Sequence, residues 1–299
     1  MQPRDRAPYS AIVDRPSLVL PPGVRLVIWP IVNLEVWEIE RPMARQVLPA
    51  PTGVAVMPDV ANWSWHEYGM RVGVWRFFAA LDRIGARATL SINAEVVDRY
   101  PRVAEAARER RWEFMGHSYV QMPIHQLADQ RATIARSLDR LEAFTGTRPR
   151  GWLGPGLTET FETPDLLAQA GVQYIGDWVY DDEPTVIATS HGPLVTLPYT
   201  VELNDIPLAT VQHQTSDVFL ARACDQFDRL YAEGAERAKI LSFAIHPYIT
   251  GVPHRIKYLE AFLAYARGHR GVAFWTGDEI LDWYRGATSR TSPTSRTGP

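Results

Sequence analysis

Three residues whose side chains suit hydrolysis each follow directly after an apolar segment of the chain. Glu35, His117 and His246 stand where these strand-like segments end. A carboxylate can take a proton from water and an imidazole can protonate a leaving nitrogen, so the set suits cleavage of an amide bond. Burying an unpaired carboxylate is costly, which favours a functional role for Glu35. Each histidine taken alone is more often a structural group.

Other polar, aromatic and proline residues lie at the ends of neighbouring strand-like segments. They are Asn33, Trp152, Pro155, Asp177, Trp178, Asn204 and Asp205. In α/β barrels the carboxyl ends of the strands meet at one rim, where active sites lie. We therefore expect these residues to share a site with Glu35, although Asn204 and Asp205 could equally form a simple turn.

Apolar segments alternate with segments of helical period between residues 24 and 285, which predicts a parallel α/β fold. Strands are expected at 24–32, 88–92, 112–115, 151–153, 172–175, 194–197, 239–245 and 271–275. Helices are expected at 72–84, 94–110, 127–144, from 163 onward, 216–233, 254–267 and 278–284. Gly146 suits the left-handed position that ends a helix. The proline-rich segment 38–68 has no clear period, and we expect a long loop near the site.

The two ends of the chain differ from the segment 24–285. Residues 1–23 are rich in proline and are expected to form an extended arm. Residues 286–299 are rich in Ser, Thr, Arg and Pro and are expected to be disordered. The single cysteine, Cys224, excludes an intrachain disulfide, and we expect it to be a small apolar side chain in a helix.

Charge and hydropathy restrict the partners and the location. The chain carries 31 basic and 34 acidic side chains, a formal net charge of −3, which argues against nucleic acid or an anionic membrane as a partner. No window approaches the ~18 apolar residues of a membrane span, and the first residues lack the apolar core of a signal peptide. We therefore expect a cytoplasmic protein whose partner is a small molecule.

Five motifs in a fixed order resemble those of the polysaccharide-deacetylase (NodB-homology) superfamily. They lie at 32–35, 114–119, 148–156, 197–205 and 242–247. The resemblance covers residues 24–285 and looks strongest for the branch that contains metal-independent allantoinases and cyclic imide hydrolases. It implies a distorted (β/α) barrel of seven or eight strands, hydrolysis of a carbon–nitrogen amide bond, and assembly into a homotetramer.

Two positions depart from the metal-dependent members of this superfamily. Those members resemble Asp-x-Asp in the first motif and His-x-x-x-His in the second. Here Asn33 replaces the usual catalytic-base aspartate, and Gln121 replaces the second histidine. A catalytic zinc site needs three good protein ligands, and Glu35 and His117 supply two, with the Gln121 amide as a poor third. We expect no cofactor, and Zn²⁺ bound by Glu35, His117 and Gln121 is the alternative.

The resemblance and the altered motifs together favour ring opening of a cyclic ureide or imide. Glu35 is expected to act as the base and His246 as the acid, while His117 orients Glu35 or donates to the substrate carbonyl. The residues expected to bind substrate are Asn33, Tyr119, Gln121, Trp152, Pro155, Trp178, Asn204 and Asp205. Two alternatives remain: a metal-dependent N-deacetylase of a sugar or glycan, and a non-catalytic barrel that binds a metabolite.

Overall fold

One curled sheet forms the centre of the molecule. The computed structural model describes residues 1–50 and 52–291. Within them the sheet has nine strands. Eight follow the spatial order β6-β7-β5-β4-β3-β2-β1-β8, and the ninth, β9, pairs with β1. All pairings are parallel except that of β6 with β7. The strands are β1 (Leu26–Leu34), β2 (Thr89–Ile92), β3 (Glu113–Gly116), β4 (Gly151–Trp152), β5 (Tyr174–Ile175), β6 (Thr185–Ile187), β7 (Leu194–Thr196), β8 (Ile240–Ile245) and β9 (Val272–Phe274).

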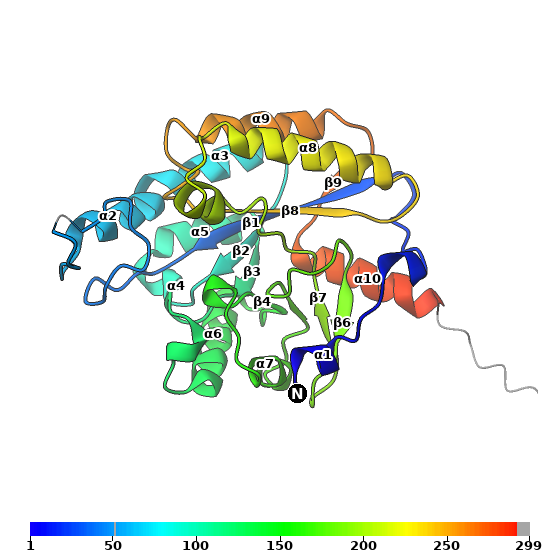
Figure 1. The fold of residues 1–299 in the computed structure, drawn as a ribbon, viewed down its shortest axis with the longest axis horizontal. Coiled ribbons are helices and arrows are strands. Elements are labelled where there is room, and N and C mark those ends of the chain that lie inside the picture. The colour runs from blue at the N-terminus through cyan, green and yellow to red at the C-terminus, as the bar shows by residue number, and fades with distance from the viewer. Residues whose placement is uncertain (51, 292–299) are drawn as a thin grey trace, which may run out of the picture.

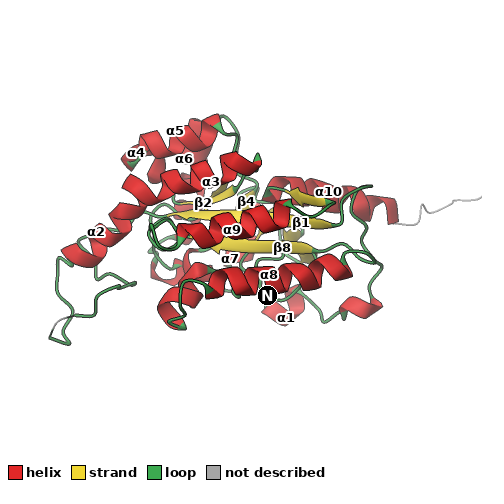
Figure 2. Ribbon diagram, turned by 90° about the horizontal axis from the view of Figure 1, so that it is seen from above, coloured by secondary structure: helices red, strands yellow, loops and turns green. Residues whose placement is uncertain are grey.

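Helices cover the strands on both sides (Figure 2). Two of them, α8 and α9, lie side by side along the sheet next to β8 (Figure 1). The α-helices are α1 (Pro3–Arg6), α2 (Val60–Tyr68), α3 (Val74–Ile84), α4 (Val96–Arg99), α5 (Pro101–Glu109), α6 (Gln130–Thr145), α7 (Thr163–Gln169), α8 (Val218–Glu233), α9 (Ile256–Arg267) and α10 (Gly277–Thr291). Shorter turns are η1 (Ile12–Asp14), η3 (Ile124–Gln126) and η4 (Pro155–Leu157), which are 3₁₀, and η2 (Gly69–Gly73) and η5 (Pro207–Val211), which are π-helical. This architecture confirms the predicted α/β barrel.

The strands place alternate side chains in two apolar layers. In β1, Ile28 and Val32 pack with the outer helices, whereas Val27, Trp29 and Ile31 face the interior of the barrel. Both sets are fully buried, which explains why β1 is an almost continuous apolar run. Because side chains alternate along a strand, the same period directs the residues that follow Ile31 at steps of two into the barrel.

The segment 38–68 is a loop only in its first part. The prolines of this segment all precede Asp59, whose carboxylate caps the next helix by accepting from the backbone N–H of Asn62 at 3.1 Å. From Val60 the chain is helical, and η2 joins α2 to α3 without a break. The predicted helix 94–110 is likewise divided, because Pro101 cannot continue α4 and begins α5. The sequence pattern also misses β6, a three-residue edge strand.

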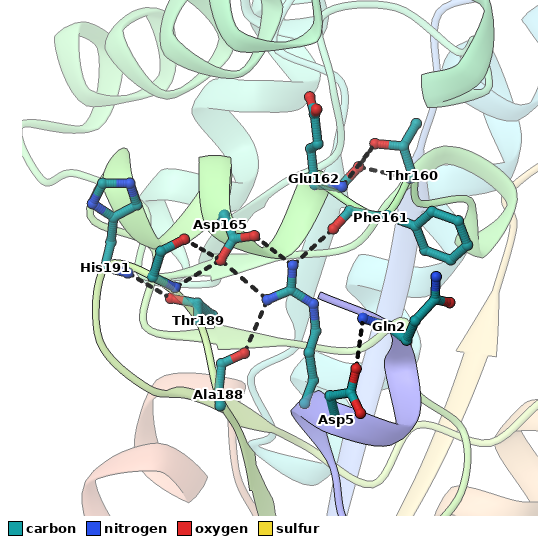
Figure 3. A network of polar contacts seen from close by, with 12 residues as sticks. Gln2, Asp5, Thr160, Phe161, Glu162, Asp165, Ala188, Thr189 and His191 are labelled. Atoms are coloured by element: carbon teal, nitrogen blue, oxygen red, sulfur yellow. Dashed lines mark hydrogen bonds and ion pairs between the residues drawn. The ribbon is translucent and has the colours of Figure 1, made fainter.

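The N-terminal arm is not extended throughout, and it is anchored to the body of the protein. Arg6, on the helical turn α1, is 2 % exposed. Its guanidinium donates to the Asp165 carboxylate at 3.1 Å and to the carbonyls of Ala188 at 2.9 Å and Phe161 at 2.7 Å. Figure 3 shows Asp165, Ala188 and Phe161 converging on this point from three segments. A buried guanidinium needs such a complete set of acceptors.

The C-terminal segment is more ordered than the sequence predicts. Helix α10 continues to Thr291, so the first residues of the predicted disordered tail are helical, and residues 292–299 lie outside the described residues. In the part of the chain that is described, no helix combines the length and the apolar character that crossing a membrane requires.

Candidate active site

Glu35, His117 and His246 meet inside the barrel at the carboxyl ends of β1, β3 and β8. They are only 7 %, 2 % and 4 % exposed. Oε1 of Glu35 lies 3.4 Å from Nε2 of His246 and 3.9 Å from Nε2 of His117. The three strand ends therefore bring one carboxylate oxygen against two imidazoles, as the sequence predicts.

The second oxygen of Glu35 is held by two hydrogen bonds. Oε2 accepts from the indole N–H of Trp37 at 3.1 Å and from the hydroxyl of Tyr248 at 3.0 Å. Burial alone would raise the pKa of Glu35, but the charge of His246 and the smaller contributions of His117 and Arg45 together hold this pKa well below its usual range. Glu35 is thus ionised, with Oε1 turned toward the imidazoles.

Asp205 lies behind His246 and fixes its orientation. Its Oδ1 accepts from Nδ1 of His246 at 2.6 Å, and its Oδ2 accepts from the backbone N–H of His246 at 2.8 Å and from the Thr250 hydroxyl at 2.6 Å. Burial alone would lower the pKa of His246, but the carboxylates of Asp205 and Glu35 raise it to about 9. The structure therefore corrects the expected role of Asp205: it contacts His246 with both oxygens, whereas it was expected to contact substrate.

His117 differs from His246 in the partner of its Nδ1–H. This N–H donates to the backbone carbonyl of Leu153 at 2.5 Å, so in the neutral tautomer Nε2 is an acceptor. This buried Nε2 has no hydrogen-bond partner among the described residues and faces Oε1 of Glu35. In this tautomer His117 can accept a proton-bearing group, such as a water O–H, but it has no proton at Nε2 to give to a substrate carbonyl.

A small cavity of about 30 Å³ adjoins these groups. Such a volume holds one or two water molecules, so a ring-shaped ligand needs a wall side chain to move. Larger hollows lie beside the N-terminal arm, and Glu35, His117 and His246 line neither of them. The cavity is lined by Asn33, Glu35, Arg45, His117, Gln121, Leu153, Gly154, Gly156, Leu157, Tyr199, Asn204, Ile206 and His246.

Three of the predicted substrate-binding residues line this cavity, each with at least one polar atom already engaged. Nδ2 of Asn33 donates to the Ile245 carbonyl at 3.4 Å. Oε1 of Gln121 accepts from the Asn93 amide at 3.3 Å. Asn204 uses both ends of its amide, because Nδ2 donates to the Tyr199 hydroxyl at 2.7 Å and Oδ1 accepts from a backbone N–H at 2.9 Å.

Two tryptophans expected in the site lie elsewhere. Trp152 faces the outer helices and packs on Gly116, where a Cβ would lie 2.7 Å from the indole ring. Strand β4 has only two residues, so its inward side chain is that of the next residue, Leu153. Trp178 donates to Glu159 at 3.0 Å and lines the hollow beside the N-terminal arm.

Tyr119 and Pro155 are also outside the set that lines the cavity. The Tyr119 ring packs under the guanidinium of Arg136, whose carbon is 3.5 Å from the ring centroid. Pro155 is buried in the turn η4, and its neighbours Gly154 and Gly156 are the residues that reach the cavity.

Sequence analysis missed several residues that contact the centre. Trp37 and Tyr248 follow Glu35 and His246 by two positions, and the strand period could have found them. Tyr199 and Thr250 lie in turns without a comparable signal. Arg45 reaches the cavity from the loop before α2, where no local pattern identifies it.

The side chains present supply too few ligands for a catalytic zinc ion. Glu35 and His117 turn an oxygen and a nitrogen toward each other, but Oε1 of Gln121 already accepts from Asn93. His246 offers no lone pair while it is protonated. Among residues 1–50 and 52–291 no group of three or more His, Cys, Asp or Glu is placed to hold a metal ion. The donor set is therefore one ligand short.

Comparison with known proteins shows which family the chain resembles. Residues 64–175 match the family model described as "Polysaccharide deacetylase". A crystal structure of a probable polysaccharide deacetylase from Pseudomonas aeruginosa PAO1 superposes with a TM-score of 0.83 at 28 % identity, covering 98 % of this chain and 99 % of that one. Residues 64–175 are thus similar to a polysaccharide-deacetylase domain, and the fold of the chain is similar to that of a probable polysaccharide deacetylase. This confirms the resemblance that the five motifs carry.

Two further relatives of this polysaccharide deacetylase fold span different substrate classes. The crystal structure of PuuE allantoinase has a TM-score of 0.82 at 27 % identity, covering 96 % of this chain and 98 % of that one. A putative polysaccharide deacetylase of Schizosaccharomyces pombe is 27 % identical over 238 residues, which is 73 % of this chain and 74 % of that protein. Deacetylases and allantoinases both hydrolyse carbon–nitrogen bonds outside peptides, which confirms the predicted enzyme class.

Proposed function

We propose that the protein hydrolyses a cyclic ureide or imide by a ring opening that needs no metal. The observation that carries the proposal is the series of contacts Asp205–His246–Glu35, in which one imidazole lies between two carboxylates. Such a group is protonated at neutral pH and can give its proton to a leaving nitrogen. The missing third zinc ligand and the small volume of the cavity support a small flat substrate over a polymer.

The proposed reaction begins with a water molecule between Oε1 of Glu35 and Nε2 of His117. Its oxygen attacks the substrate carbonyl carbon while one proton passes to Glu35. The carbon–nitrogen bond then breaks as Nε2 of His246 gives its proton to the ring nitrogen. Transfer of the proton from Glu35 to His246, across the 3.4 Å that separates them, restores the starting state. Loss of the His246 charge also removes the largest of the effects that lower the pKa of Glu35, so the two proton transfers assist each other.

The first test concerns the two proton-transfer groups. Glu35→Gln and His246→Ala should each lower kcat by about 10²- to 10⁴-fold, because each removes a group that moves a proton in the reaction. Glu236→Gln and His191→Ala change exposed side chains and should leave kcat unchanged. Circular dichroism and thermal unfolding would verify that the variants fold. Turnover in Glu35→Gln or His246→Ala equal to that of the controls would refute these roles.

The second test concerns substrate and metal. Purified protein treated with a chelator should open hydantoins, cyclic imides or allantoin, and elemental analysis should find far less than one metal ion per chain. Hydrolysis of N-acetylated sugars that is lost with bound zinc would instead establish a metal-dependent deacetylase. Binding of ring compounds without turnover would establish a metabolite-binding protein.

A further inference from the structure

Arg45 is a cation in the wall of the cavity that makes no hydrogen bond or ion pair with the described residues. It lines the same cavity as Glu35, His117 and His246. Its Nε is buried and has no hydrogen-bond acceptor among the described residues, and none of their ion pairs includes it. By contrast, the well-buried guanidiniums of Arg6 and Arg237 have carboxylate partners. Leaving a buried donor unpaired is costly, so Arg45 is suited to an acceptor that arrives with the substrate.

The loop that carries Arg45 is fixed on both sides of it. Met43 is buried on one side. On the other, the backbone N–H groups of Val47 and Leu48 donate to Oδ1 of Asn62 at 2.8 and 3.1 Å, and the Asn62 amide donates back to the Leu48 carbonyl at 2.9 Å. Asn62 belongs to α2, so this helix positions the loop. Arg45 is therefore held at the cavity by its backbone, while its guanidinium has no fixed contact.

The reaction needs a hydrogen-bond donor in the cavity, and several of the other side chains there already donate elsewhere. Attack on an amide carbonyl places negative charge on its oxygen, which must receive hydrogen bonds. In its neutral tautomer, His117 has no proton at Nε2, because its one N–H donates to the Leu153 carbonyl. Nδ2 of Asn33 and Nδ2 of Asn204 already donate to protein acceptors. Arg45 is the one arginine or lysine among the described residues that line this cavity.

The distribution of charge supports the same assignment. Glu35 and Asp205 carry two negative charges, and protonated His246 and Arg45 carry two positive charges. When water gives its proton to Glu35, one negative charge moves from the Glu35 carboxylate to the carbonyl oxygen of the substrate. A guanidinium with no hydrogen bond to Glu35 can interact with that oxygen without breaking a contact of the resting protein. The interaction is then stronger in the transition state than in the ground state, which is the condition for catalysis.

We infer that Arg45 donates to the carbonyl oxygen of the bond that is cleaved and stabilises the oxyanion formed there. This assignment rests on the proposed amide hydrolysis. It also defines the substrate further: the scissile carbonyl oxygen points toward the loop before α2, and the leaving nitrogen points toward His246. The direction of the ring in the cavity is fixed by these two groups.

The test compares Arg45→Ala with Arg41→Ala, an exposed position in the same loop. Loss of an oxyanion donor should lower kcat of Arg45→Ala by about 10²- to 10³-fold while KM changes little. Millimolar guanidinium chloride should restore part of the activity of Arg45→Ala, whereas an equal concentration of sodium chloride should not. Arg41→Ala should keep wild-type kcat under all these conditions, and thermal unfolding of both variants should match the wild type.

The outcomes separate this inference from the proposed function. A kcat of Arg45→Ala equal to that of Arg41→Ala overturns the inference, and so does an effect confined to KM, which would indicate ground-state binding. If the wild type hydrolyses N-acetyl sugars but no cyclic ureide or imide, the proposed substrate is wrong. The comparison of Arg45→Ala is then made on that acetamide, because its hydrolysis passes through the same kind of oxyanion. A wild type that hydrolyses neither class overturns both.

Discussion

At the scale of single residues, the pKa of His246 is determined by two neighbouring carboxylates. His246 is buried between the carboxylates of Asp205 and Glu35, which raise its pKa to about 9 against the opposing effect of burial. His117, across the same carboxylate, directs its Nδ1–H to a backbone carbonyl, so in the neutral tautomer its Nε2 is an acceptor. One imidazole can thus give a proton while the other can accept a hydrogen bond, and the difference comes from their partners.

The pH dependence of turnover should follow His246. Its acid form is lost as pH rises through about 9, so kcat should fall on the alkaline side of that value. Replacing Asp205 with Asn removes one of the two charges that raise this pKa, so burial lowers it and the alkaline limb should move to lower pH. Turnover should also drop by roughly 10³-fold, because Nδ1 loses the acceptor that orients the ring. A pH–rate profile of Asp205→Asn with an unmoved alkaline limb would contradict this account.

At the scale of elements, the π-helical turn η2 determines how closely the end of β8 approaches α2 and α3. A Cβ at Gly73 would lie 2.0 Å from the carbonyl oxygen of Pro247, and one at Gly69 would lie 2.8 Å from the backbone nitrogen of Tyr248. These two glycines let the segment after His246 pack directly on the helix backbone. The packing of α2 and α3 and the position of His246 are therefore coupled through Pro247.

Adding a methyl group at Gly73 should damage activity more than folding. Gly73→Ala should push the Pro247 carbonyl away and move His246, with a loss of roughly 100-fold in kcat. Overpacking should cost about 1–3 kcal/mol of stability. The control is Gly286→Ala in α10, where a Cβ would meet no atom within 4 Å, so kcat should stay unchanged and stability should not fall. Kinetics and thermal unfolding of the two variants test both expectations. A wild-type kcat for Gly73→Ala would contradict the proposed coupling.

At the scale of the whole molecule, the two ends of the barrel have different buried polar groups. The end opposite the cavity holds Glu113, whose carboxyl group accepts from the hydroxyls of Thr89 and Tyr174. Burial and the neighbouring Asp278 carboxyl group of α10 raise the pKa of Glu113 to about 8. This network joins the start of β3 to α10, the helix that closes the fold. It contributes to the stability of the fold.

Stability should therefore decline between pH 4.5 and about 8 because of Glu113. Its folded pKa of about 8 exceeds the ordinary value of 4.5. The folded state keeps a proton that the unfolded chain releases, so stability is lost as pH rises from 4.5 and levels off above 8. Glu113→Gln mimics the protonated carboxyl group, so it should unfold at a higher temperature than the wild type at pH 9 and at a similar temperature at pH 5. The exposed Glu236→Gln should show no such difference, and parallel melting curves for Glu113→Gln and wild type across this range would exclude the effect.

The sequence by itself determined the strands that build the site and three residues at their ends. Long apolar runs such as β1 and β8 are buried on both faces in any parallel sheet, so they stand out without a structure. The first polar residues beyond them, Glu35 and His246, then have to lie at the carboxyl rim. Gly146 ends α6 in the left-handed conformation, as expected, because its requirement is local.

Only the tertiary structure decided which side chains share the cavity. In a strand of two residues such as β4, the pairing with neighbours and not the local pattern sets which side faces inward, so Trp152 lies outside and Leu153 inside. Asp205 and Arg45 reach the centre from segments whose paths depend on contacts distant in sequence, such as that of Asn62 with Leu48. The sequence thus placed Glu35 and His246 at one rim, while long-range packing chose the residues that orient His246 and line the cavity.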